Sequence, residues 1–87
     1  MALYVDRPIW QWRGMLWAHL IADTSLDELH AAARALQIPT RAFDGDHYDI
    51  PEERWSQVVA YGALPVSSRE IVRVLRTAGL RAPKHLR

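Results

Sequence analysis

The sequence contains no cysteine, which excludes disulfide bonds, thiolate nucleophiles and thiolate zinc sites. It also lacks any apolar run near the roughly 20 residues that a membrane-spanning helix needs, and its first residues do not resemble a secretory signal. The formal net charge is only +1, from 11 basic and 10 acidic residues. No strong overall field therefore attracts nucleic acid or a membrane, and a cytoplasmic location is expected.

What is present is the composition of a folded domain, with 49% hydrophobic and 24% charged residues in a chain of 87. The charges are unevenly distributed. Residues 44–53 hold five acids and no lysine or arginine, whereas residues 69–87 are rich in arginine and contain a single acid, Glu70. We expect one domain over residues 1–80, followed by a basic tail over residues 81–87 that frays.

Short apolar runs predict the strands. The first runs over residues 2–5 and the second over 19–23, which is continuous enough to be covered on both faces. HYDI, at residues 47–50, predicts a third strand and residues 63–66 a fourth. The segment between the first two strands leaves open whether they are joined by a crossover or by a wide hairpin.

Helix-start signals separate these strands. Ser25 with Glu28, and Ser67 with Glu70, form S-x-x-E capping boxes, in which a hydroxyl and a carboxylate satisfy amides of the first turn. They predict helices over residues 24–36 and 67–78, and Pro51 predicts the start of another that ends at residue 61. Alternating strands and helices predict an α/β fold: a small sheet of three or four strands, mostly parallel, with three helices.

Polar residues at the strand-to-helix junctions predict a ligand site at one edge of such a sheet. Asp23, Asp49 and Ser67 lie at these junctions, where helix capping is the simpler interpretation. His47 and Asp49 are two residues apart, so in a strand they share a face at roughly 7 Å, a span that one divalent ion or phosphate can bridge. Asp23 would supply a third oxygen. The predicted metal ligands are therefore His47, Asp49 and Asp23.

A second pair involves Asp6 and His19. If the first two strands are antiparallel, Asp6 at the end of one faces His19 at the start of the other. A carboxylate that orients a histidine is a common catalytic arrangement, although an ordinary buried hydrogen bond is the simpler interpretation. His30 flanks the apolar face of the first helix, where a half-buried structural role is expected. The candidate catalytic residues are His19, Asp23, His47 and Asp49.

Aromatic and basic residues suggest where a ligand could bind. Trp10, Trp12 and Trp17 with Arg13 could form a platform that stacks a base, or they could be core material with Trp17 inside. The arginines of the last helix could contact phosphates or face only solvent. The candidate ligand-binding residues are Asp6, Trp12, Arg13, Ser67 and Arg69.

Four stretches carry a resemblance to a known family: YVD near the start, WAHLIADTSLDELHAAA, GDHYDIPEER and GALPVSSREIVRVLR. Together they resemble a small family of bacterial and phage proteins of unknown function, DUF4031, over nearly the whole chain. The resemblance implies no assigned activity, and the presence of such proteins in phages suggests nucleotide or nucleic-acid metabolism by association only. The recurring family features match Trp17, His19, Asp23, His30, His47, Tyr48, Asp49, Gly62, Arg69 and Glu70.

Two functions are expected from these residues. The first is binding of a phosphate-bearing ligand, a nucleotide or a nucleic-acid end, at the edge lined by Asp23, His47, Asp49, Ser67 and Arg69, with hydrolysis assisted by a divalent metal ion. The alternative is a non-enzymatic interaction module, such as a homodimer or a nucleic-acid binder, that uses the tryptophan-rich loop or the basic last helix. No membrane partner is expected.

Overall fold

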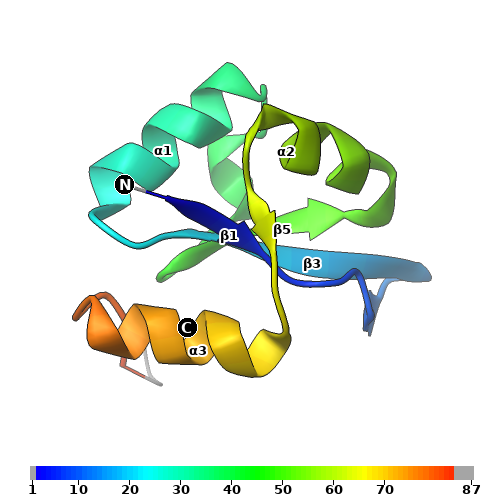
Figure 1. Ribbon diagram of the computed structural model, residues 1–87. Helices are drawn as coiled ribbons and strands as arrows, with labels where there is room; N and C mark the ends of the chain where they lie inside the picture. The colour runs from blue at the N-terminus through cyan, green and yellow to red at the C-terminus, as the bar shows by residue number, and fades with distance from the viewer. Residues whose placement is uncertain (1, 84–87) are drawn as a thin grey trace.

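The computed structural model describes residues 2–83, which form a sheet with helices on both of its faces (Figure 1). Short 3₁₀ turns lie at Thr40–Ala42 and Glu52–Arg54. The strands of this part of the chain are β1 (Leu3–Val5), β2 (Trp10–Trp12), β3 (Met15–Ala22), β4 (Phe43–Asp44), β5 (His47–Pro51) and β6 (Leu64–Pro65). Its helices are α1 (Leu26–Ala35), α2 (Trp55–Tyr61) and α3 (Ser68–Thr77).

The α/β class is confirmed, but the expected sheet of three or four mostly parallel strands is wrong. The strand order is β4-β5-β3-β1-β6, and β2 also pairs with β3. In the described sheet, the parallel pair is formed by β1 and β6. The first two predicted strands, β1 and β3, are antiparallel because the chain reverses in a hairpin rather than crossing over. Arg13 and Gly14 have φ of 51° and 73° at the tip of this hairpin, backbone angles that match the twist of its two strands.

The starts of α1 and α3 are confirmed by their caps, whereas the helix expected to start at Pro51 begins at Trp55, after a 3₁₀ turn. Ser25 Oγ accepts a hydrogen bond from the Glu28 amide, and Ser67 Oγ accepts one from the Glu70 amide, both at 3.1 Å. Figure 1 shows α1 and α2 on one face of the sheet and α3 on the other. The larger apolar core lies under α1 and α2. The smaller one joins Ile21 of β3 to Ile71, Val74 and Leu75 of α3.

Strand alternation decides which side chains share the α3 face of the sheet. Leu20 belongs to the larger core and Ile21 to the smaller, so His19, with the parity of Ile21, faces the α3 side. His19 is paired in register with Asp49 of β5, which places Asp49 and His47 on that same face. α3 covers the part of this face around Ile21. The part next to it, around His19, stays open for a site.

No helix within residues 2–83 is long and apolar enough to cross a membrane. The first residues of the predicted basic tail pack against the rest of the protein, because Arg81 and the Ala82 amide contact the buried carboxylate of Asp46. Residues 84–87 lie outside the described part of the chain.

Candidate metal centre

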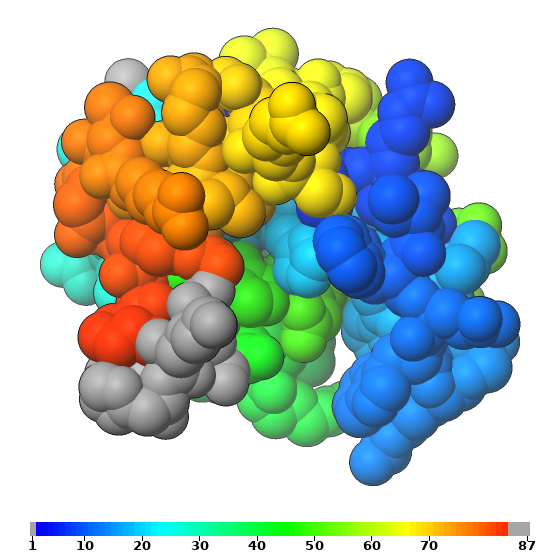
Figure 2. Space-filling view, turned by 90° about the horizontal axis from the view of Figure 1, so that it is seen from below, coloured from blue at the N-terminus to red at the C-terminus, as the bar shows by residue number. Residues whose placement is uncertain are grey.

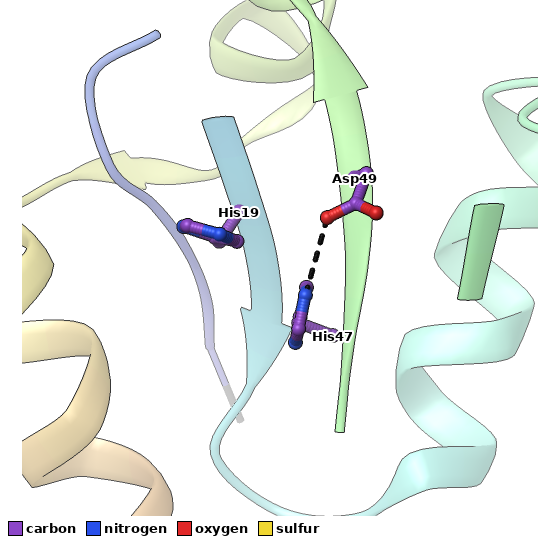
Figure 3. A group of neighbouring side chains, drawn as sticks. All are labelled: His19, His47 and Asp49. Carbon is purple, nitrogen blue, oxygen red and sulfur yellow. Dashed lines mark ion pairs between the residues drawn. The ribbon is translucent and has the colours of Figure 1, made fainter. Parts of the chain in front are cut away.

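Three side chains that can bind a metal converge on the open part of this face. His19 comes from β3, and His47 and Asp49 come from the adjacent strand β5 (Figure 3). Each offers one ligand atom, and these atoms all lie within 4.8 Å of one another. His47 Nε2 is 3.1 Å from Asp49 Oδ1, and the two imidazole rings are 4.8 Å apart in an edge-to-face arrangement.

A buried carboxylate fixes the orientation of His19. Asp6 is fully buried, and its Oδ2 lies 2.8 Å from His19 Nδ1 while its Oδ1 accepts the His19 amide at 2.6 Å. Ser68 donates its hydroxyl to Asp6 Oδ2 at 2.9 Å. Burial alone would raise the pKa of Asp6, but the hydrogen bonds from His19 and Ser68 outweigh it and hold that pKa below its ordinary value. Asp6 is therefore an anion at neutral pH.

His47 is held in a similar way from the other side. Asp46 is also fully buried, and its Oδ1 lies 2.7 Å from His47 Nδ1. Its Oδ2 accepts the Ala82 amide at 2.8 Å and a long contact from Arg81 at 3.4 Å. Burial alone would lower the pKa of His47, but the contacts with Asp49 and Asp46 outweigh it and raise that pKa. The surroundings of His47 thus stabilise a positive charge.

These contacts fix the tautomers. An anionic carboxylate can only accept, so Nδ1 of each imidazole is the donor and Nε2 is the nitrogen that can bind a metal; in His47 a metal would displace the Nε2 proton that faces Asp49 Oδ1 at 3.1 Å. A histidine that binds a metal through one ring nitrogen commonly donates the N–H of the other to a carboxylate, which fixes the orientation of the ring. Two such histidines and one carboxylate suit zinc with an open coordination position, or ferrous iron.

The charge balance of the group also favours a cation. The carboxylates of Asp6, Asp46 and Asp49 lie around the two imidazoles. Within residues 2–83, Arg81 supplies the one guanidinium within 4 Å of these carboxylates. A divalent cation between the imidazoles and Asp49 would balance the remaining negative charge.

His19 and His47 line a hollow of about 270 Å³ between the sheet and α3. Trp10 forms one wall, with its indole 5.5 Å from the His19 ring, and its Nε1 makes a long contact of 3.4 Å to Asp6. Ser68, Val72 and Arg81 also line this hollow. The side-chain exposures of 25% for His19, 13% for His47 and 37% for Asp49 leave all three within reach of a small ligand.

Asp23, expected as the third metal ligand, lies elsewhere. Its carboxylate accepts the Ala2 amide at 2.9 Å and the Thr24 hydroxyl at 3.0 Å, and these hydrogen bonds, the Ala2 amide foremost, lower its pKa against a small opposing effect of burial. The expected grouping assumed parallel strands that end at one edge. In the antiparallel pair β3–β5 the residue opposite Asp49 is His19, so His19 takes the place that was assigned to Asp23.

Ser67 and Arg69 are also outside the group. Ser67 caps α3 and lines a separate shallow hollow with Arg7, and Arg69 is exposed on α3. It is the next serine, Ser68, that contacts Asp6. His30 has the expected structural role, since its Nδ1 lies 2.6 Å from the hydroxyl of buried Tyr48.

Four residues of the site were not found by the sequence reasoning: Asp46, Trp10, Ser68 and Arg81. Asp46 directly precedes His47, and this position is the signal that could have predicted its carboxylate–histidine contact. Trp10 was expected either in a stacking platform or in the core, and not as a wall of the site. No local pattern marks Ser68 or Arg81, because their contacts with Asp6 and Asp46 span 62 and 35 residues.

The fold and the site define a small α/β protein with a candidate divalent-metal centre on one face of its sheet. Residues 3–78 match the family model described as Protein of unknown function (DUF4031), and the chain belongs to this family. No curated protein and no solved structure matches the chain.

Proposed function

We propose that the protein binds a divalent metal ion through His19, His47 and Asp49 and uses it to hydrolyse a phosphate-bearing ligand. One observation carries this proposal: two histidines on neighbouring strands, each fixed at Nδ1 by a fully buried aspartate, converge with a third carboxylate. Two buried anions are expensive to place in a small core, and orienting metal ligands is a role that accounts for both.

A metal ion in this position would lower the pKa of a bound water and polarise a phosphoryl oxygen. The residues around it have separate tasks. Asp6 and Asp46 hold the two imidazoles, Trp10 excludes water from one side of the hollow, and Arg81 lies where it can meet a negatively charged ligand group. Asp49 is the most exposed of the three proposed ligands, so its carboxylate is the one most open to an arriving substrate.

Metal binding tests the proposal. In calorimetry and thermal-shift measurements with zinc, manganese and magnesium, we expect at least one ion to bind and to raise the melting temperature. His47→Ala should weaken that affinity by about a hundredfold, since changes merely behind metal ligands already weaken binding 10- to 100-fold. Hydrolysis of a chromogenic phosphodiester by the loaded protein should disappear in the same variant.

The matched control is His30→Ala, which removes a histidine bonded to Tyr48 on the other side of the sheet. It should leave metal affinity unchanged. Absence of stabilisation by all three ions, or equal affinities in the His47 and His30 variants, would contradict the metal centre.

A second candidate function is self-association through the β2–β3 hairpin. Large apolar residues in and next to this hairpin are exposed to solvent. The exposed fractions are 63% for Ile9, 48% for Trp10, 55% for Trp12 and 38% for Met15. If they form an interface, sedimentation should show a dimer at micromolar concentration that Ile9→Asp dissociates. A monomer throughout the concentration range would contradict this candidate.

A further inference from the structure

A second hollow adjoins the candidate metal centre. It measures about 510 Å³ and lies between the β2–β3 hairpin and the segments around the two 3₁₀ turns. Asp49 belongs to its lining and is also 3.1 Å from His47, which lines the first hollow. The two hollows therefore border the same pair of candidate metal ligands, His47 on one side and Asp49 on the other. Figure 2 views this face, with the hairpin (blue) standing on one side, α3 (yellow to orange) along another, and green residues recessed between them.

The lining of this second hollow is basic. Arg13, Arg41 and Arg54 contribute to it, and Asp49 is the one acid among its lining residues in the described part of the chain. Within residues 2–83, neither Arg13 nor Arg41 has an acidic side chain within ion-pair distance, and both are exposed. Arg54 is held in place by the Leu36 carbonyl and the Gln57 side chain. In a chain of net charge +1, this places a local excess of positive charge beside the proposed reaction site.

Exposed aromatic rings belong to the lining of both hollows. Trp10 and Trp12 are two residues apart on β2, so they share a face at a spacing of roughly 7 Å. Trp10 lies in the first hollow and Trp12 in the second. Arg13 sits 4.6 Å from the centre of the Trp12 ring, and Trp17 meets the same ring edge to face at 5.7 Å. These contacts fix the orientation of the Trp12 indole, while roughly half of Trp10 and of Trp12 remains exposed.

From this arrangement we infer that the two hollows form one groove that binds single-stranded nucleic acid across the metal centre. Successive bases would stack on Trp10 and Trp12, and the phosphates between them would meet Arg13 and Arg41. The inference names the substrate class of the hydrolytic site and rests on the proposed function to that extent. Paired aromatic platforms with interleaved arginines are the usual means of binding a strand without reading its sequence.

The positive charge of the arginines and the exposed indoles together favour single-stranded nucleic acid over other ligands. A single free phosphate would use one arginine and none of the indoles, and an apolar peptide would leave the arginines without partners. A base-paired duplex has its bases stacked inside, so it could not offer them to two indoles on the edge of a hairpin. A strand offers both a line of phosphates and free base faces.

Binding can be measured without metal, which separates this inference from the proposed function. Fluorescence anisotropy of labelled dT and rU 12-mers in EDTA should show saturable binding at low salt by at least one of the two. Its logarithmic salt dependence should have a slope of about −0.7 for each phosphate contact. A DNA hairpin duplex of the same length should bind at least tenfold more weakly. The two homopolymers distinguish DNA from RNA as the preferred strand.

Variants locate the binding site. The pair Arg13→Ala with Arg41→Ala should weaken binding and reduce the magnitude of the salt slope by roughly 1.4, which is two phosphate contacts. Trp12→Ala should weaken binding roughly fivefold to a hundredfold, the range for loss of one stacked base. The matched control, Arg34→Ala with Arg76→Ala, removes the same charge from exposed positions on α1 and α3. It should change binding less than threefold.

Three results would overturn the inference: no binding of either homopolymer at low salt, equal loss in the two arginine pairs, or duplex bound as tightly as the single strand. None of them bears on the calorimetric test of metal binding. If metal binds and the strand does not, the hydrolytic site acts on another phosphate-bearing ligand. If the strand binds and metal does not, the groove remains as a nucleic-acid binding site without hydrolysis.

Discussion

Replacing Asp6 by alanine should lower the free energy of unfolding by about 3–5 kcal/mol, the range found when one partner of a buried ion pair is removed. The carboxylate is fully buried and accepts hydrogen bonds from the His19 ring, the His19 amide and the Ser68 hydroxyl. All three donors would lose this partner. For a domain of this size, each kilocalorie corresponds to about 4–8 °C in melting temperature, so thermal and urea unfolding measure the effect directly.

Asp6→Asn tests the positioning role of the same residue more gently. It keeps the shape of the side chain but presents an amide where His19 Nδ1 needs an acceptor, so the fold should survive better than with alanine. Metal affinity should still fall 10- to 100-fold, a loss that a merely structural carboxylate would not produce.

The control is Asp44→Ala, which removes an exposed aspartate on β4 and should change stability by less than about 0.5 kcal/mol. If the Asp6→Ala change costs no more than the Asp44→Ala change, the network around Asp6 is not what the structure describes.

Replacing Ile21 by alanine should destabilise the protein by about 2–5 kcal/mol, as expected for a large apolar side chain removed from a closely packed core. Ile21 is fully buried and joins the sheet to Ile71, Val74 and Leu75 of α3 in a small core. Because α3 also carries Ser68, loosening α3 should reduce metal affinity as well, which calorimetry on the folded fraction would measure.

Ile9→Ala is the matched control for this substitution. It is the same chemical change at a position that is 63% exposed, so unfolding in urea should show a shift of less than about 0.5 kcal/mol. A similar loss in both variants would mean that α3 does not depend on Ile21 for its packing.

The candidate site was predictable in part, and the outcome differs residue by residue. Asp6 and His19 were paired on the condition that their strands are antiparallel, and they are. His47 and Asp49 were expected on one face of a short strand, and they lie there because side chains alternate with a period of two. Asp23 was assigned to the site from an assumed parallel sheet, and the antiparallel pairing put His19 opposite Asp49 instead.

The sequence by itself determined the local elements: where helices begin, from the Ser25 and Ser67 caps, and which side chains share a strand face, from alternation. These depend on contacts within a few residues, which the order of residues fixes. Only the tertiary structure decided which strands are neighbours and in which direction they run. That choice set His19 beside His47 and Asp49, and brought Ser68 and Arg81 to the two buried aspartates. It depends on how apolar faces from distant segments pack together, and strand pairing across tens of residues leaves no local signal in the chain.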